Sequence, residues 1–200
     1  MKAIFVTIHG QESNGKNMKA LSDKLEAAYF TYDCAFVNIR YTKLLTIVNT
    51  LPWVRTMTAK YIASRLETIK YKFPEAAIIV AAHSNGTRAT SIAMKKRNKA
   101  RKSKSKYPDF RIDHLLLLGC PIKRSFDWSR FPSTGVINFI SVDDKVVFMA
   151  RLYGMGSAGR YGFKKSSKNL NQVWMKWGHS GFMKHYSVIK GYVKEILENL

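Results

Sequence analysis

The chain of 200 residues is 46% hydrophobic, which is enough for one domain with a substantial core and too short to suggest two, so we predict a single domain over residues 1–200. Its 34 Lys and Arg residues outnumber 13 Asp and Glu residues, and the formal net charge of +21 predicts attraction to polyanions such as nucleic acid, anionic lipid or acidic polymers. No apolar run approaches the ~20 residues that cross a bilayer, which excludes a transmembrane helix and predicts a soluble protein.

Short apolar runs alternate with helix-like stretches along the chain. The predicted strands are 3–8, 34–39, 76–82, 114–119, 136–142 and 172–177. The predicted helices are 16–30, 53–73, 85–97 and 182–200. Continuous apolar runs of this length suit strands that are buried on both faces of a parallel sheet. Since the strand-to-helix repeat implies right-handed crossovers, we predict a three-layer α/β sandwich with a mostly parallel sheet of about six strands flanked by helices.

The first predicted strand is followed by a glycine-containing turn that allows two interpretations. Gly10, Gly15 and Lys16 have nearly the spacing of the loop that wraps nucleotide phosphates. That loop needs Ser or Thr after its lysine to hold magnesium, and this chain has Asn17 there. We therefore reject the nucleotide interpretation and expect Gly15 and Lys16 to open the first helix.

The third predicted strand runs into Ala82-His83-Ser84-Asn85-Gly86 and then into a helix pattern. Small residues two before and two after a serine relieve crowding in the strained strand-to-helix turn called a nucleophile elbow. Such a turn presents the serine hydroxyl at the carboxyl edge of the sheet, where the next backbone N–H and the helix N-terminus also point. The structural alternative is a serine that only caps the helix.

A strongly basic segment follows this helix pattern, and we predict that residues 95–106 form a mobile surface loop. Its basic residues are Lys95, Lys96, Arg97, Lys99, Arg101, Lys102, Lys104 and Lys106. Runs of like charge are usually solvated, but this density also suits an anionic partner, and both interpretations stay open. A second segment, 153–169, is rich in Gly, Ser and Lys and is likewise predicted to be a flexible surface loop.

A serine nucleophile needs a base, and the base needs a third group that orients it. Asp143 and Asp144 follow the fifth predicted strand, and His179 follows the sixth. The order serine, acid, histidine along a chain is one of three known orders for such triads. His83 neighbours the serine in sequence, but its side chain is expected to point elsewhere in the elbow.

These motifs together resemble the α/β-hydrolase superfamily, in particular its small lipase-like and esterase-like members with little or no lid. The resemblance spans nearly the whole chain in four motifs, Ile8-His9-Gly10-Gln11, Ala82-His83-Ser84-Asn85-Gly86, Asp144-Lys145-Val146-Val147 and Gly178-His179-Ser180. The chain departs from the family at Ala82, where Gly is commoner.

The resemblance implies a catalytic role for Ser84, His179 and an aspartate. The family's Asp-x-x-Val pattern favours Asp144 as the acid and leaves Asp143 as the alternative. By the same resemblance, the N–H groups of Gln11 and Asn85 form the oxyanion hole, and His9 and Gly10 belong to the oxyanion loop. The implied reaction is cleavage of a carboxylic ester or related acyl bond through an acyl-enzyme, without a metal or other cofactor.

The connection at 121–134 is too short for a large lid, so we expect an open cleft that accepts a small-molecule, lipid or polymer ester, some of them anionic. Met149, Met155 and Met183 are candidates for an adaptable apolar surface near the site, although filling the core is the commoner use of methionine. A hydrolase-like scaffold that binds nucleic acid or another polyanion without catalysis is the alternative function.

Charge and cysteine usage give two further expectations. Like-charge repulsion opposes tight self-association through the basic face, so a monomer is predicted. Cys34 and Cys120 lie within or beside apolar runs, which predicts free thiols and a reducing, cytoplasmic setting.

Overall fold

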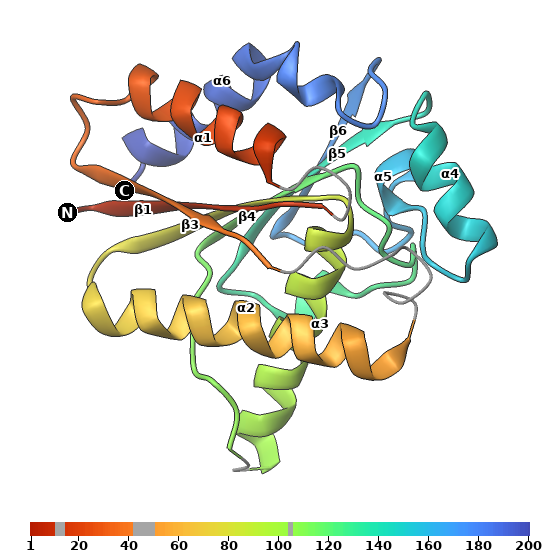
Figure 1. Cartoon of the computed structure of the whole chain (residues 1–200), viewed down its shortest axis with the longest axis horizontal. Coiled ribbons are helices and arrows are strands. Elements are labelled where there is room, and N and C mark those ends of the chain that lie inside the picture. Colours follow the sequence, from red (N-terminus) through yellow and green to blue (C-terminus); the bar gives the residue numbers. More distant parts are fainter. Residues whose placement is uncertain (11–14, 42–50, 104–105) are drawn as a thin grey trace.

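The computed structural model describes residues 1–10, 15–41, 51–103 and 106–200, and its centre is one six-stranded sheet (Figure 1). The strands are β1 (Ala3–Ile8), β2 (Cys34–Ile39), β3 (Ala77–His83), β4 (His114–Leu118), β5 (Gly135–Ser141) and β6 (Leu170–Met175). Their order across the sheet is β2-β1-β3-β4-β5-β6, and all five neighbouring pairs are parallel. The predicted sheet is therefore confirmed, with every pairing parallel.

Helices cover both faces of the sheet and make the three predicted layers. The helices are α1 (Lys16–Ala28), α2 (Pro52–Lys72), α3 (Asn85–Ser103), α4 (Lys145–Leu152), α5 (Ala158–Tyr161) and α6 (Tyr186–Glu198). Figure 1 shows α1 and α6 on one face and α2 and α3 on the other. In the described ranges, no helix is long and apolar enough to cross a membrane.

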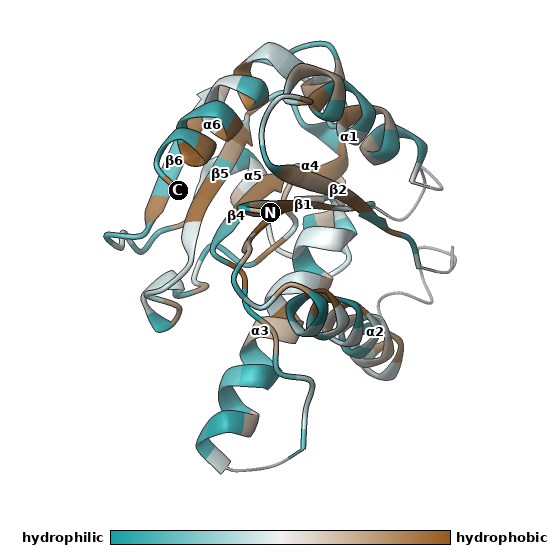
Figure 2. Ribbon diagram, turned by 90° about the vertical axis from the view of Figure 1, so that its left-hand side faces the viewer, coloured by the Kyte–Doolittle hydropathy of each residue, from teal (hydrophilic) through white to brown (hydrophobic). Residues whose placement is uncertain are grey.

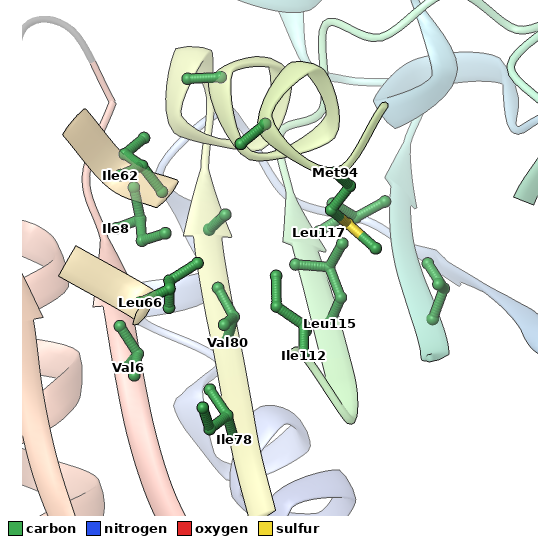
Figure 3. Close-up of a cluster of buried hydrophobic side chains, with 14 of the residues drawn as sticks. Val6, Ile8, Ile62, Leu66, Ile78, Val80, Met94, Ile112, Leu115 and Leu117 are labelled. Carbon is green, nitrogen blue, oxygen red and sulfur yellow. The ribbon is translucent and has the colours of Figure 1, made fainter. Parts of the chain in front are cut away.

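The core has two halves because successive strand residues point to opposite faces of the sheet. Figure 3 shows one half, in which Val6 and Val80 of the sheet face Leu66 of α2, and Met94 of α3 lies close by. In the other half, Phe5 and its neighbours pack against α1 and α6. Since both faces are covered, the strands carry the continuous apolar runs seen in the sequence.

The prediction of a loop over 95–106 is wrong, because α3 continues to Ser103. Lys and Arg are good helix formers, and basic residues in a last turn interact favourably with the helix dipole. This end of α3 is also anchored, since Arg97 Nε lies 3.0 Å from Asp109 Oδ1. Figure 2 shows the end of α3 projecting below the body of the molecule as a hydrophilic helix. Lys104 lies outside the described residues.

The prediction of a flexible loop over 153–169 is wrong in its middle. Residues 156–159 are buried, and α5 lies within the segment. The backbone packs so closely here that a Cβ on Gly156 would lie 1.9 Å from the carbonyl carbon of Ile122, and one on Gly159 would lie 2.2 Å from the nitrogen of Cys120. The glycines therefore serve close packing of two chain segments rather than mobility.

Candidate active site

Ser84 occupies the tight turn between β3, which ends at His83, and α3, which begins at Asn85. Its φ of 50° makes it the one non-glycine residue with positive φ in the described ranges. That conformation costs roughly 1–2 kcal/mol for an L-residue and persists only where neighbours hold it. The Ser84 N–H donates to the carbonyl of Leu118 at 2.8 Å, and its own carbonyl accepts from Thr87 N–H and Oγ1 at 3.0 and 2.7 Å.

Glycines next to this turn allow the loop after β1 to approach it. A Cβ on Gly10 would lie 2.7 Å from the Cβ of Ser84. A Cβ on Gly86 would lie 2.5 Å from the carbonyl oxygen of His9. Both positions therefore require glycine, while Ala82, two residues before Ser84, is fully buried.

The structure brings Asp144 and His179 together from the ends of β5 and β6. His179 Nδ1 lies 2.8 Å from Asp144 Oδ2 and 3.1 Å from Oδ1. The Asp144 side chain is buried and also accepts the Val147 N–H at 2.8 Å, which caps α4. Asp143 is exposed. Of the two adjacent aspartates, Asp144 is the one that contacts the histidine.

Gly119 supports this pair from the end of β4. Its φ is +56°, and a Cβ there would lie 2.8 Å from His179 Cε1 and 3.3 Å from Asp144 Oδ2. Glycine is thus required twice, for the backbone conformation and for the space that the imidazole occupies.

We expect Gly119→Ala to lower both the free energy of unfolding and kcat. The positive φ alone should cost roughly 1–2 kcal/mol, and displacing the imidazole by about 1 Å should lower kcat by about 100-fold. Gly154→Ala is the matched control, since Gly154 has φ +69° and a Cβ added there would meet no atom within 4 Å. Urea unfolding and steady-state kinetics would check this, and equal kcat in both variants would contradict it.

His83 packs against the ring and the backbone of His179. Its ring centroid is 4.7 Å from that of His179, and its Nε2 lies 3.1 Å from the His179 carbonyl oxygen. Because a carbonyl only accepts, Nε2 donates, and His83 fixes the backbone of the histidine instead of acting as a base. Burial, aided by the nearby imidazole of His179, lowers the pKa of His83 to about 3.

This lowered pKa makes stability depend on pH. Between pH ~6.5 and 3, the unfolded chain binds a proton at His83 that the folded protein does not, so the free energy of unfolding falls as the pH drops. We expect a loss of about 2 kcal/mol between pH 7 and 5 from this residue. Urea unfolding at both pH values would measure it, and His83→Gln should flatten the dependence. An unchanged slope in that variant would count against the assignment.

His9 holds the loop after β1. Its Nδ1 donates to the Gly10 carbonyl, and its Nε2 accepts the Tyr41 N–H at 3.1 Å. The Tyr41 ring stacks on the imidazole at 4.2 Å, and its hydroxyl donates to the His9 carbonyl at 2.8 Å. Burial lowers the pKa of His9, which keeps it neutral in this role. Gln11, the second expected oxyanion donor, lies outside the described residues.

Ser84, Asn85 and His179 all line one pocket of about 510 Å³. Its apolar wall comes largely from α4 and the chain after it, through Val146, Val147, Met149, Ala150 and Met155. Met183 instead packs against the core beside α6. The neighbouring thiol of Cys120 is buried, which raises its pKa to about 12, so it is no competing nucleophile at neutral pH.

No basic residue of α3 lines this pocket. With 1.5 Å of rise per residue, Lys99 is roughly 20 Å along the helix axis from Asn85, which exceeds the ~8 Å Debye length at physiological salt. Three of the described basic residues have structural contacts, because Lys95 lies 4.4 Å from the centre of the Phe126 ring and both Arg97 and Arg101 pair with Asp109. The basic end of α3 and the pocket are therefore separate parts of the surface.

Comparisons with known proteins identify the fold. No family model matches the chain, and no curated protein matches its sequence. Among solved structures, a Xanthomonas campestris pv. campestris protein described as an α/β-superfamily hydrolase superposes over 100% of both chains with a TM-score of 0.62 at 12% identity. The mature lipase BlEst2 of Bacillus licheniformis matches over 98% of this chain and 92% of its own, with a TM-score of 0.62 at 13% identity. An acetylxylan esterase matches over 98% of both chains, with a TM-score of 0.57 at 12% identity.

Proposed function

We propose that this chain, which has the α/β-hydrolase fold, is a serine hydrolase that cleaves a carboxylic ester or related acyl bond. The observation that carries the proposal is the buried Asp144 carboxylate bonded to His179 Nδ1, beside a pocket that His179 shares with Ser84. A serine in a positive-φ strand-to-helix turn at that pocket is the arrangement that exposes a nucleophilic hydroxyl. The esterases and lipases of the same fold agree with this chemistry.

The mechanism follows from these contacts. The Nδ1–H of His179 donates to Asp144, which leaves Nε2 as the base. Nε2 takes the proton of Ser84 Oγ as this oxygen attacks the carbonyl carbon. The developing oxyanion accepts from the N–H of Asn85, whose place in the first turn of α3 leaves it without an intrahelical partner. By resemblance, the Gln11 N–H is the second donor.

The intermediate then collapses in two stages. The bond to the leaving oxygen breaks, and the proton on His179 passes to the departing alcohol, which leaves an acyl group on Ser84. Water, deprotonated by His179, attacks this ester, and the proton returns to Ser84 as the acid leaves. These reaction steps require no metal or organic cofactor.

Fluorophosphonate labelling tests the proposal directly. The native protein is expected to form a covalent adduct that peptide mass spectrometry places on Ser84. Heat-unfolded protein is the control, because its serines lack the oriented base. A folded protein that forms no adduct, or one that is labelled at Ser180 of the same pocket, would refute the assignment.

A second candidate function is polyanion binding at the outer end of α3, where Lys99, Arg101 and Lys102 are exposed. A purely binding protein would leave Ser84 unlabelled and bind nucleic acid with an affinity that falls steeply with salt.

We also propose a cytoplasmic setting and a monomer. The free thiols of Cys34 and Cys120 support the cytoplasmic setting, and the large net charge supports the monomer.

A further inference from the structure

Helix α4 exposes most of its apolar side chains. Phe148 is 41% exposed, Met149 48%, Val146 49% and Leu152 69%, while only Val147 of this helix is buried. At 100° per residue, the four exposed side chains span an arc of about 160°. Isolated exposed apolar residues are ordinary, but a continuous face of this kind marks an interaction surface. We call these four residues the α4 face.

The α4 face continues into the pocket. Val146 and Met149 belong to the exposed face and also line the pocket that contains Ser84. Ala150 of the same helix lines it too. An apolar chain that lies on the α4 face can therefore enter the pocket along Val146, Met149 and Ala150, and Ser84 lines the same pocket.

The charged residues that follow Asp144 in the sequence are all basic over a long stretch. Residues 145–194 contain ten Lys and Arg residues and no Asp or Glu. Lys145 and Arg151 of α4 itself are exposed, and the Arg160 guanidinium lies 4.9 Å from the centre of the Phe148 ring. The acidic residues that precede α4 are Asp144, which is buried against His179, and Asp143, which is exposed.

These features together select one kind of partner. Nucleic acids and acidic polysaccharides would match the charge but offer no apolar interior for the α4 face. A second copy of this chain would offer apolar surface but brings a further +21 of like charge. A surface of anionic lipid supplies both negative charge and an acyl interior, which is what amphipathic interfacial helices bind.

We propose that the α4 face docks on an anionic lipid surface and that the substrate is a lipid ester taken from it. This inference rests on the proposed function, since it names the substrate of the same site. The acyl chain leaves the lipid along Val146 and Met149, and its carbonyl reaches Ser84. The basic residues around α4 hold the protein on the surface while the chain enters.

Vesicle cosedimentation tests the docking step. Ser84→Ala protein, which cannot consume the lipid, is mixed with vesicles of phosphatidylcholine alone or of phosphatidylcholine and phosphatidylglycerol in equal parts. The anionic vesicles should bind it more strongly. Adding Phe148→Ser and Leu152→Ser should weaken this binding about tenfold or more, since two apolar side chains no longer enter the lipid. Neither residue lines the pocket.

Matched controls separate docking from other effects. Phe30→Ser removes an equally apolar side chain, 82% exposed, from the turn between α1 and β2 at the opposite edge of the sheet, and should leave binding unchanged. With Ser84 restored, the α4 double variant should keep its kcat for a soluble short-chain ester and lose turnover of esters held in anionic vesicles.

The outcomes distinguish this inference from the proposed function. Turnover of soluble esters without vesicle binding, or vesicle binding that survives the α4 double variant, would overturn the lipid inference alone. Binding lost through Lys99→Glu, Arg101→Glu and Lys102→Glu instead would place the lipid contact on α3 and also overturn it. Vesicle binding by a protein that hydrolyses no ester would overturn the proposed function and with it the lipid-ester substrate, and would support the docking surface alone.

Discussion

Replacing Ser84 by alanine is expected to lower kcat for a soluble ester by about 10⁴- to 10⁶-fold. The hydroxyl is the group that attacks the carbonyl in the proposed mechanism, and the remaining pocket offers only binding and oxyanion contacts. Alanine keeps the volume of the turn close to that of serine, so the free energy of unfolding should change by less than about 1 kcal/mol. Hydrolysis of a chromogenic ester and urea unfolding would measure the two effects.

Ser180 provides the matched control for this variant. It lines the same pocket and follows His179 directly, yet the mechanism gives it no role. Ser180→Ala should therefore keep kcat within a few-fold of the native value. If the two alanine variants lost activity equally, or if Ser84→Ala remained active, the proposed mechanism would be wrong.

The second large effect is expected for Asp144→Asn, which should lower kcat by about 10⁴-fold. The amide keeps an oxygen for the Val147 N–H that caps α4, so the fold should be retained. It cannot stabilise an imidazolium, and it favours the wrong tautomer of His179, with the proton on Nε2. Steady-state kinetics on the same soluble ester, with the native protein beside the variant, would measure the loss.

Asp143→Asn is the control that the sequence itself supplies. It makes the same chemical change one residue away, at a side chain that is exposed and for which the structure shows no contact with His179. It should leave kcat within about twofold of native, since an exposed charge acts weakly through water. Equal losses of kcat in the two variants would show that removing any negative charge near the site lowers kcat, and that the hydrogen bond between Asp144 and His179 is not the cause.

Much of the fold was predictable because buried parallel strands leave a simple trace in sequence. Each of the six apolar runs became a strand, with bounds shifted by at most two residues. The helices that were missed are short, and α4 has only one buried side chain, Val147, so it lacks the apolar periodicity that identifies a core helix.

The candidate site was partly predictable because its residues lie in local motifs at strand ends. Ser84, with its positive φ, and Gly86 belong to one short segment, and the residues of this segment are enough to predict the tight turn. Other contacts depend on residues distant in sequence. Nothing near Tyr41 indicates that its ring stacks on His9, and nothing near His83 indicates that its Nε2 reaches the carbonyl of His179.

The two loop predictions, for 95–106 and 153–169, are wrong for different physical reasons. The dense charge at 95–106 favours irregular structure, but Lys and Arg extend a helix readily when its earlier turns are already packed. The glycine content of 153–169 predicts mobility, whereas Gly156 and Gly159 let the chain pack against the segment after Gly119. Composition alone does not distinguish a glycine that makes the backbone flexible from one that allows two segments to pack closely.

The order of strands β3, β4, β5 and β6 across the sheet is also their order in the chain. During synthesis, this half of the sheet can therefore grow outward one strand at a time. His179 follows Ser84 by 95 residues (179 − 84), so at about 5–20 residues per second the ribosome adds the base roughly 5–20 s after the nucleophile. Until β6 has joined the edge of the sheet, the nascent chain carries a serine without its base. Hydrolytic activity in a translation reaction would therefore appear only when the whole sheet has formed, and not when the turn that holds Ser84 has formed.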